Sequence, residues 1–144
     1  MPAHFRCPSC GKINRVRPER LDQGPSCGHC HAALDLSGAP AHLDDAAARR
    51  LVEASPVPVL VDFYADWCGP CRSLAPTLAE LGRRHSGKLI VIKVDTDRNP
   101  GLASSLGVKG IPALFLYKGG TVVQQTSGAQ PLPALESMVR PYLG

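Results

Sequence analysis

The sequence predicts an α/β protein, with a mixed β-sheet covered by helices on both faces and a small segment in front of it. Three observations predict this fold class. From residue 43 onward, short apolar runs alternate with runs of helical periodicity. Gly119-Gly120 separates two strand-like runs, which is a hairpin signal. The first forty residues instead contain few large apolar side chains and four of the six cysteines.

The elements follow one another in the order β-α-β-α-β-β-α after an initial helix. Pro56 ends that first helix. Leu74, Leu78 and Leu81 share one face of the long helix, and Pro76 is expected to kink it. The expected elements are a helix over 43–55, a buried strand over 57–64, a long helix from about Cys68, a strand over 89–95, a short helix over 100–106, strands over 113–118 and 121–127, and a closing helix that contains residues 135–142.

The amino-terminal segment is too small to fold by burial alone. A chain of about thirty residues normally needs a metal, disulfide bridges or a partner to hold its structure. Ser37-Gly38-Ala39-Pro40 has the composition of a linker. We therefore expect three parts: a small domain over 1–37, a linker over 38–42 and a larger domain over 43–144.

Two cysteine pairs, Cys7/Cys10 and Cys27/Cys30, lie in the small domain with the spacing Cys-x2-Cys-x16-Cys-x2-Cys. This is the spacing of a zinc ribbon, in which four thiolates close a tetrahedral site around one Zn²⁺. Gly11 and Gly28 are expected to give the two turns their backbone freedom. A closed four-sulfur site leaves no open position for a substrate, so the metal is expected to be structural.

Other interpretations of these cysteines stay open at the level of sequence. The two pairs are also compatible with redox-active disulfides, or with iron at the same ligands. His4, His29 or His31 is a further candidate to replace one cysteine ligand.

Composition and charge exclude several classes of protein. Hydrophobic residues make up 44% of the 144 residues and charged residues 19%, which is typical of a folded globular chain. The net charge of +4 is too small to predict nucleic-acid binding. Basic residues near the amino end are interpreted as a solvated face that also offsets the negative charge of a zinc–thiolate centre. They are Arg6, Lys12, Arg15, Arg17 and Arg20.

No run of residues is long and apolar enough to predict a membrane span. The first twenty residues carry charges and two cysteines where a secretory signal has an uninterrupted apolar core. We therefore expect a cytoplasmic protein without a membrane partner. In such a reducing compartment, paired cysteines are more often metal ligands or catalytic thiols than structural bridges.

The third pair lies in Trp67-Cys68-Gly69-Pro70-Cys71, where a predicted strand ends and the long helix begins. Cys68 is then at the amino end of the helix, where unpaired N–H groups and the helix dipole stabilise a thiolate. Cys71 is almost one turn further along, within bonding reach. We expect Cys68 to attack a substrate disulfide and Cys71 to resolve the mixed disulfide.

Residues 61–71, with Ile111-Pro112 and Ser127-Gly128, resemble the thioredoxin family from about Leu43 to the carboxyl end. The resemblance implies a thioredoxin fold with four or five strands in the central sheet. It also implies a monomer, disulfide-containing client proteins, no organic cofactor, and reduction of the Cys68–Cys71 disulfide by an NADPH-linked thioredoxin reductase. Together with the zinc ribbon, nearly the whole chain is similar to the second, zinc-binding type of bacterial thioredoxin.

The resemblance also assigns roles to residues outside the cysteine pair. Asp62 matches a buried acid that accepts the proton of Cys71, with Lys93 as its partner; the alternative is that the two merely form an ion pair. Pro112 matches a cis-proline facing the cysteines. Trp67, Gly69, Pro70, Ile111, Pro112 and Gly128 are expected to bind the substrate.

Two residues depart from the usual pattern, and both affect the expected redox potential. Asp66 precedes Trp67 and opposes formation of the Cys68 thiolate, while Tyr64 stands where many relatives have tryptophan.

The predicted function is that of a protein-disulfide reductase that maintains the cell's redox balance, with a structural or redox-responsive zinc site. One alternative is a zinc-ribbon binding module whose larger domain serves as a scaffold. Another is a disulfide isomerase or oxidant. Gly69-Pro70 between the cysteines is similar to the reducing members of the family.

Overall fold

The protein, seen here in a computed structural model that describes residues 2–144, contains two β-sheets. The smaller sheet is an antiparallel hairpin of β1 (Ala3–Arg6) and β2 (Ile13–Val16). The larger sheet has the strand order β3-β5-β4-β6-β7. Its strands are β3 (Ala41–His42), β4 (Val59–Tyr64), β5 (Ile90–Asp95), β6 (Ala113–Lys118) and β7 (Thr121–Ser127).

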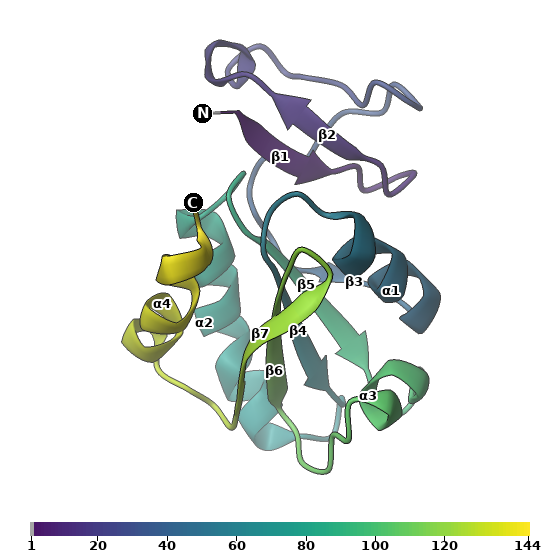
Figure 1. Ribbon diagram of the computed structural model, residues 1–144, viewed down its shortest axis with the longest axis vertical. Coiled ribbons are helices and arrows are strands. Elements are labelled where there is room, and N and C mark those ends of the chain that lie inside the picture. Colours follow the sequence, from purple (N-terminus) through teal and green to yellow (C-terminus); the bar gives the residue numbers. More distant parts are fainter. Residues whose placement is uncertain (1) are drawn as a thin grey trace.

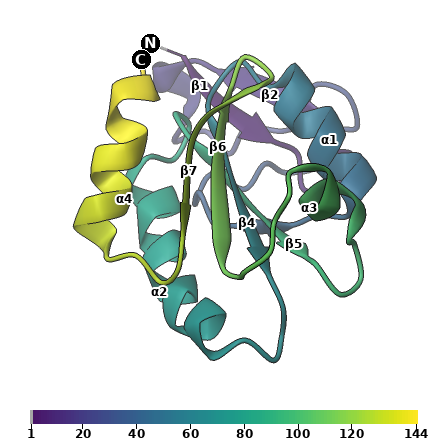
Figure 2. The same ribbon diagram turned by 60° about the horizontal axis from the view of Figure 1, so that its bottom comes forward.

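Four α-helices cover the larger sheet. They are α1 (Asp45–Ala54), α2 (Gly69–Arg84), α3 (Gly101–Ser105) and α4 (Leu132–Val139), with short 3-10 turns at Pro18–Arg20 and Arg140–Tyr142. Figures 1 and 2 show α1 and α3 on one face of the sheet and α2 and α4 on the other. The expected mixed sheet with helices on both faces is confirmed.

Strand β4 is the centre of this sheet, parallel to β5 and antiparallel to β6. Its residues alternate between two cores because successive side chains of a strand point to opposite faces. Val61 and Phe63 pack with α1 and α3, and Leu60 packs with α2 and α4. The next inward position on the α2 face is Asp62, a fully buried carboxylate in an otherwise apolar layer.

The linker and the first helix differ from the sequence prediction. Ala41 and His42, expected in the linker, form β3 and pair in parallel with Ile92 and Lys93 at the edge of the sheet. The first helix begins two residues later than expected, because Asp44 caps it by accepting the Ala47 N–H at 2.8 Å.

The small domain packs firmly against the large one. The His4 N–H donates to the Gly87 carbonyl at 2.9 Å, in the turn between α2 and β5. Further along the chain, the linker crosses α2 at a pair of glycines. A Cβ on Gly82 would collide with the backbone carbonyl of Gly38, and the reverse also holds. The hairpin and linker are therefore docked on the carboxyl end of α2.

Candidate functional site

The redox cysteines lie where β4 ends and α2 begins, as the sequence predicts. Cys68 is the N-cap residue of α2, and its Sγ accepts the backbone N–H of Cys71 at 3.2 Å. Cys68 and Cys71 form a disulfide, with a Cα–Cα distance of 5.2 Å. Both residues are almost fully buried, with 4% and 2% of their surface exposed. After reduction, the same N–H donor and the helix dipole stabilise a thiolate at Cys68.

A loop far away in sequence closes over this disulfide. The Ile111–Pro112 peptide bond is cis, and the carbonyl oxygen of Ile111 lies 3.8 Å from Cys68 Sγ. The N–H of Gly128 donates to the Pro112 carbonyl at 2.9 Å, from a backbone with φ of +84° that favours glycine. The structure thus brings the cysteines and this loop together, and it ties Gly128 to the loop.

Trp67 is an exposed aromatic beside the buried disulfide. It has 69% of its surface exposed, and its indole N–H donates to Asp97 Oδ2 at 2.9 Å. An open cavity of about 260 Å³ lies between Trp67 and Ile111, with Val108 and Lys109 on its wall. No sequence pattern pointed to Asp97, Val108 or Lys109, because they lie in loops that only the fold brings to Trp67.

Asp62 lies on the sheet face that α2 covers, and Lys93 lies opposite it on β5. Lys93 Nζ is 3.8 Å from Asp62 Oδ2, and neither carboxylate oxygen has a hydrogen-bond partner among residues 2–144. Burial raises the pKa of Asp62 to about 6, although the positive charge of Lys93 lowers it. The carboxyl group therefore titrates close to neutral pH, which suits it to exchange a proton.

Tyr64 holds Lys93 in place from the side. The ammonium group of Lys93 lies 4.7 Å from the centre of the Tyr64 ring, a cation–π contact. The Tyr64 hydroxyl and His42 Nδ1 are 3.0 Å apart, and His42 belongs to the edge strand β3. Tyr64 thus provides both an aromatic face for Lys93 and a hydroxyl within hydrogen-bond distance of His42.

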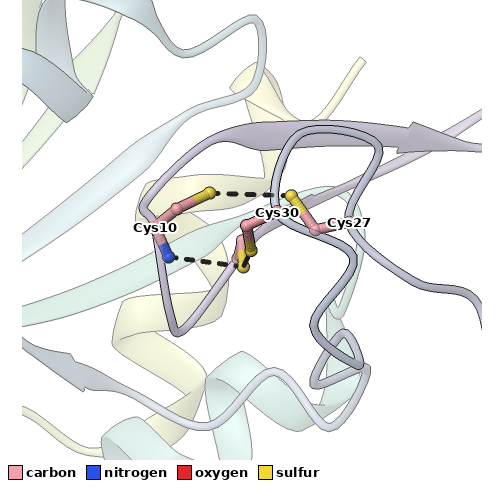
Figure 3. A group of neighbouring side chains, drawn as sticks. Cys10, Cys27 and Cys30 are labelled. Carbon is pink, nitrogen blue, oxygen red and sulfur yellow. Dashed lines mark hydrogen bonds between the residues drawn. The ribbon is translucent and has the colours of Figure 1, made fainter.

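The four cysteines of the small domain converge on one point. Their sulfur atoms all lie within 4.8 Å of one another, with 3.5 Å between those of Cys7 and Cys30 and 3.6 Å between those of Cys10 and Cys27. Figure 3 shows Cys10 approaching from one loop and Cys27 and Cys30 from the other. Four thiolates at about 2.3 Å from a tetrahedral ion are about 3.8 Å apart, so the cluster fits a metal of this kind.

The two cysteine loops have the same backbone geometry. Cys7 N–H donates to Lys12 O and Cys27 N–H to Ala32 O, both at 2.8 Å. The fifth residue of each loop has a positive φ, +82° at Gly11 and +67° at His31. The expectation for Gly28 was therefore wrong: the left-handed position of the second loop is His31, and Gly28 instead donates its N–H to Asn14 Oδ1 at 2.9 Å.

The charges of the cluster favour a bound cation. N–H donors, that of Cys30 foremost, lower the pKa of Cys27 to about 5. The Lys12 N–H acts in the same direction on Cys10, but burial and the three neighbouring cysteines outweigh it and raise the pKa of Cys10 to about 11. Four thiolates this close together repel one another, so all four can be ionised only with a positive charge between them. His4, His29 and His31 are not members of this four-sulfur cluster.

The four-cysteine cluster and the redox pair lie at opposite ends of the molecule. The hairpin contacts the turn after α2, whereas Cys68 caps the start of α2. The 16 residues of α2 span about 24 Å at 1.5 Å per residue. Figure 1 shows the hairpin beyond one end of the sheet, with β4 and β5 pointing away from it.

Of the helices that the structure describes, none combines the length and apolarity needed to cross a membrane.

Comparison with known proteins gives matches over both domains. Residues 39–141 match the family model described as "Thioredoxin", and residues 6–32 match the one described as "Thioredoxin 2, N-terminal". Thioredoxin C-3 of Corynebacterium nephridii is 40% identical over 123 residues, 85% of this chain and 83% of that protein. Thioredoxin 1 of a Nostoc species is 44% identical over 105 residues, 73% of this chain and 98% of that protein.

A solved structure supports the same relationship. A thioredoxin mutant from Halobacterium salinarum superimposes with a TM-score of 0.69 at 33% identity. The superposition covers 76% of this chain and 96% of that one.

Proposed function

This chain belongs to the thioredoxin family and is a thiol–disulfide oxidoreductase, and we propose the role of three of its residues in that reaction. Cys68 is the attacking thiolate, Cys71 the resolving thiol and Asp62 the proton acceptor. The observation that carries this proposal is the position of Cys68 Sγ at the start of α2, where it accepts the Cys71 N–H and bonds to Cys71.

The reaction reduces one client disulfide and oxidises the two thiols of this chain. The Cys68 thiolate attacks one client sulfur, the client S–S bond breaks, and the other client sulfur leaves as a thiolate that takes a proton. Cys71, having lost its proton, then attacks Cys68 Sγ. The mixed disulfide breaks, the second client thiolate is released, and the Cys68–Cys71 disulfide forms.

Asp62 takes up the proton of Cys71 in the second step. Both cysteines of the pair lie in or beside α2, on the sheet face where Asp62 is buried. A carboxyl group with a pKa of about 6 can accept a proton near neutral pH and return it in the next cycle. Lys93, at 3.8 Å, keeps the ionised form accessible.

The client is expected to bind over the surface around Cys68. An extended client segment bonds to the backbone of Ile111, whose carbonyl already lies 3.8 Å from Cys68 Sγ. The exposed Trp67 and the half-buried Ile111 offer apolar contacts, while Pro112 is itself buried. Gly69, Pro70 and Gly128 present small or rigid surfaces that let the client backbone come close.

Cys7, Cys10, Cys27 and Cys30 are proposed to hold one structural Zn²⁺. The sulfur spacing supports this, and so does the lack of any open position in a four-thiolate site. Zinc rather than iron is supported by the likeness of residues 6–32 to the thioredoxin 2 amino-terminal family. Cys68 caps the start of α2, whereas the hairpin contacts the turn after the other end of that helix, so no direct reaction between Cys68 and this site is expected.

The expected partners are a thioredoxin reductase, which regenerates the dithiol, and disulfide-containing clients in the cytoplasm. A turnover assay with NADPH, thioredoxin reductase and a disulfide substrate tests the proposal. Cys68→Ser and Cys71→Ser are both expected to abolish turnover. A mixed disulfide with the client accumulates only in Cys71→Ser, which keeps the attacker and lacks the resolver. Turnover that survives in Cys68→Ser would refute the mechanism.

A further inference from the structure

A cleft separates the amino-terminal hairpin from α1, far from the redox pair. It is an open cavity of about 500 Å³, within the size range of small-molecule sites. One wall is a single face of the hairpin. In the β1–β2 register His4 lies opposite Arg15 and Arg6 opposite Ile13, so these four side chains project to the same side, and all four line the cleft.

The facing wall is one stripe of α1. Ala47, Arg50, Leu51 and Ala54 follow the helical spacing i, i+3, i+4 and i+7, which places them on one side of the helix. Pro56 continues the wall beyond the helix. The cleft thus has an apolar floor, made largely by α1 and Ile13, between two cationic edges.

Four basic side chains form these edges. They are Arg6, Lys12 and Arg15 from the hairpin and Arg50 from α1. Over residues 2–144, none of the four forms an ion pair with a carboxylate, and no aspartate or glutamate lines the cleft. By contrast, Arg83 and Arg84 on α2 are both paired with Glu80.

The metal cluster accounts for only part of this charge. A four-thiolate Zn²⁺ centre carries two net negative charges, and Cys10 is its one ligand that reaches the cleft. Arg6, Lys12, Arg15 and Arg50 carry four positive charges. At least two of them are left for a ligand.

We propose that this cleft binds a nucleoside di- or triphosphate, a ligand that goes beyond the proposed reductase function. The phosphates bind between Arg15 and Arg50, with Arg6 and Lys12 close by, because guanidinium groups match phosphate oxygens in geometry and charge. The base lies on the apolar floor formed by Ile13 and Leu51. The bound nucleotide bridges the metal-bearing hairpin and the redox domain.

Calorimetric titration of the full metal-loaded protein with ATP, without Mg²⁺, tests the proposal. Adenosine and inorganic tripolyphosphate are titrated in parallel, since each carries half of the recognised chemistry. We expect ATP to bind with a Kd below roughly 1 mM and at least about tenfold more tightly than either fragment. Lack of ATP binding, or equal binding of tripolyphosphate, would overturn the assignment to a nucleotide.

A matched pair of double variants places the site. Arg15→Gln/Arg50→Gln removes one cation from each wall and is expected to weaken ATP binding by about tenfold or more. Arg17→Gln/Arg49→Gln makes the same change in net charge, but neither residue lines the cleft, so its affinity should match the wild type. Equal weakening in both pairs would show a general charge effect and refute the site.

Hydrogen exchange gives a readout that does not depend on these variants. ATP is expected to protect amides of β1, β2 and α1 together, because it bridges the two walls. Protection elsewhere, without protection of these elements, would place the ligand outside the cleft and overturn the proposal. Disulfide reduction by Arg15→Gln/Arg50→Gln should equal that of the wild type, which confirms that the fold is intact.

Discussion

The buried carboxyl group of Asp62 makes the stability of the oxidised protein depend on pH. Its pKa is about 6 in the folded chain, where burial penalises the charged form, and about 3.9 in an unfolded chain. The folded state therefore binds the proton more tightly. Between pH 4 and pH 6 the folded chain holds more protons than the unfolded one, so the free energy of unfolding falls as the pH rises.

The size of this loss follows from the two pKa values. One pKa unit corresponds to about 1.36 kcal/mol, so the difference between about 6 and about 3.9 gives about 3 kcal/mol. This contribution is complete below about pH 4 and lost above about pH 6. The amide of Asp62→Asn cannot titrate, so the free energy of unfolding of this variant should not show this fall between pH 4 and pH 6.

Urea unfolding of oxidised protein at several pH values between 4 and 8 measures the effect. The comparison uses the change with pH rather than the absolute stability, because the Asn amide is also buried without partners. Asp22→Asn, at an exposed position of the small domain, serves as the matched control and should keep the wild-type decline. Parallel curves for wild type and Asp62→Asn would refute the assignment of a raised pKa.

Three further changes have defined outcomes. Lys93→Met removes the positive charge that lowers the pKa of Asp62. In the same urea series, the pH midpoint of the stability loss should therefore be higher in this variant than in the wild type. An unchanged pH midpoint would exclude an electrostatic effect of Lys93 on Asp62. Cys10→Ser should abolish stoichiometric zinc in metal analysis while NADPH-linked reduction continues, since the redox pair lies at the other end of α2; full zinc content would contradict the four-sulfur site. Gly82→Ala should lower the free energy of unfolding by about 1–3 kcal/mol in urea, because the added Cβ collides with the backbone of Gly38. For comparison, Ala79→Gly on the exposed surface of α2 should lower it by about 1 kcal/mol, the cost of a glycine within a helix.

Local signals in the sequence were sufficient for most of the fold. The bounds of β6 and β7 agree with the prediction, because Gly119-Gly120 fixes the turn and the continuous apolar run before it fixes the first of the two strands. The cysteine spacing likewise predicted the four-sulfur cluster, and the boundary between the apolar strand and the long helix predicted the cap position of Cys68. In each case, neighbours in the sequence carry the whole signal.

Features that depend on distant contacts could not be predicted. β3 has two residues and exists because β5 offers them an edge. The left-handed residue of the second cysteine loop is His31, a position that residue preference alone would not select. The contacts that join His42, Tyr64 and Lys93, and the two walls of the cationic cleft, arise from segments that only the folded sheet brings together.

The proposed mechanism requires Cys68 to be an anion near neutral pH, which its position as the cap of α2 favours. The most direct measurement is the rate at which iodoacetamide alkylates Cys68 in reduced Cys71→Ser, followed by mass spectrometry as a function of pH. If the helix start stabilises the Cys68 thiolate, the rate is half-maximal well below pH 8.5, the midpoint of an ordinary thiol. A midpoint at or above that value would contradict it.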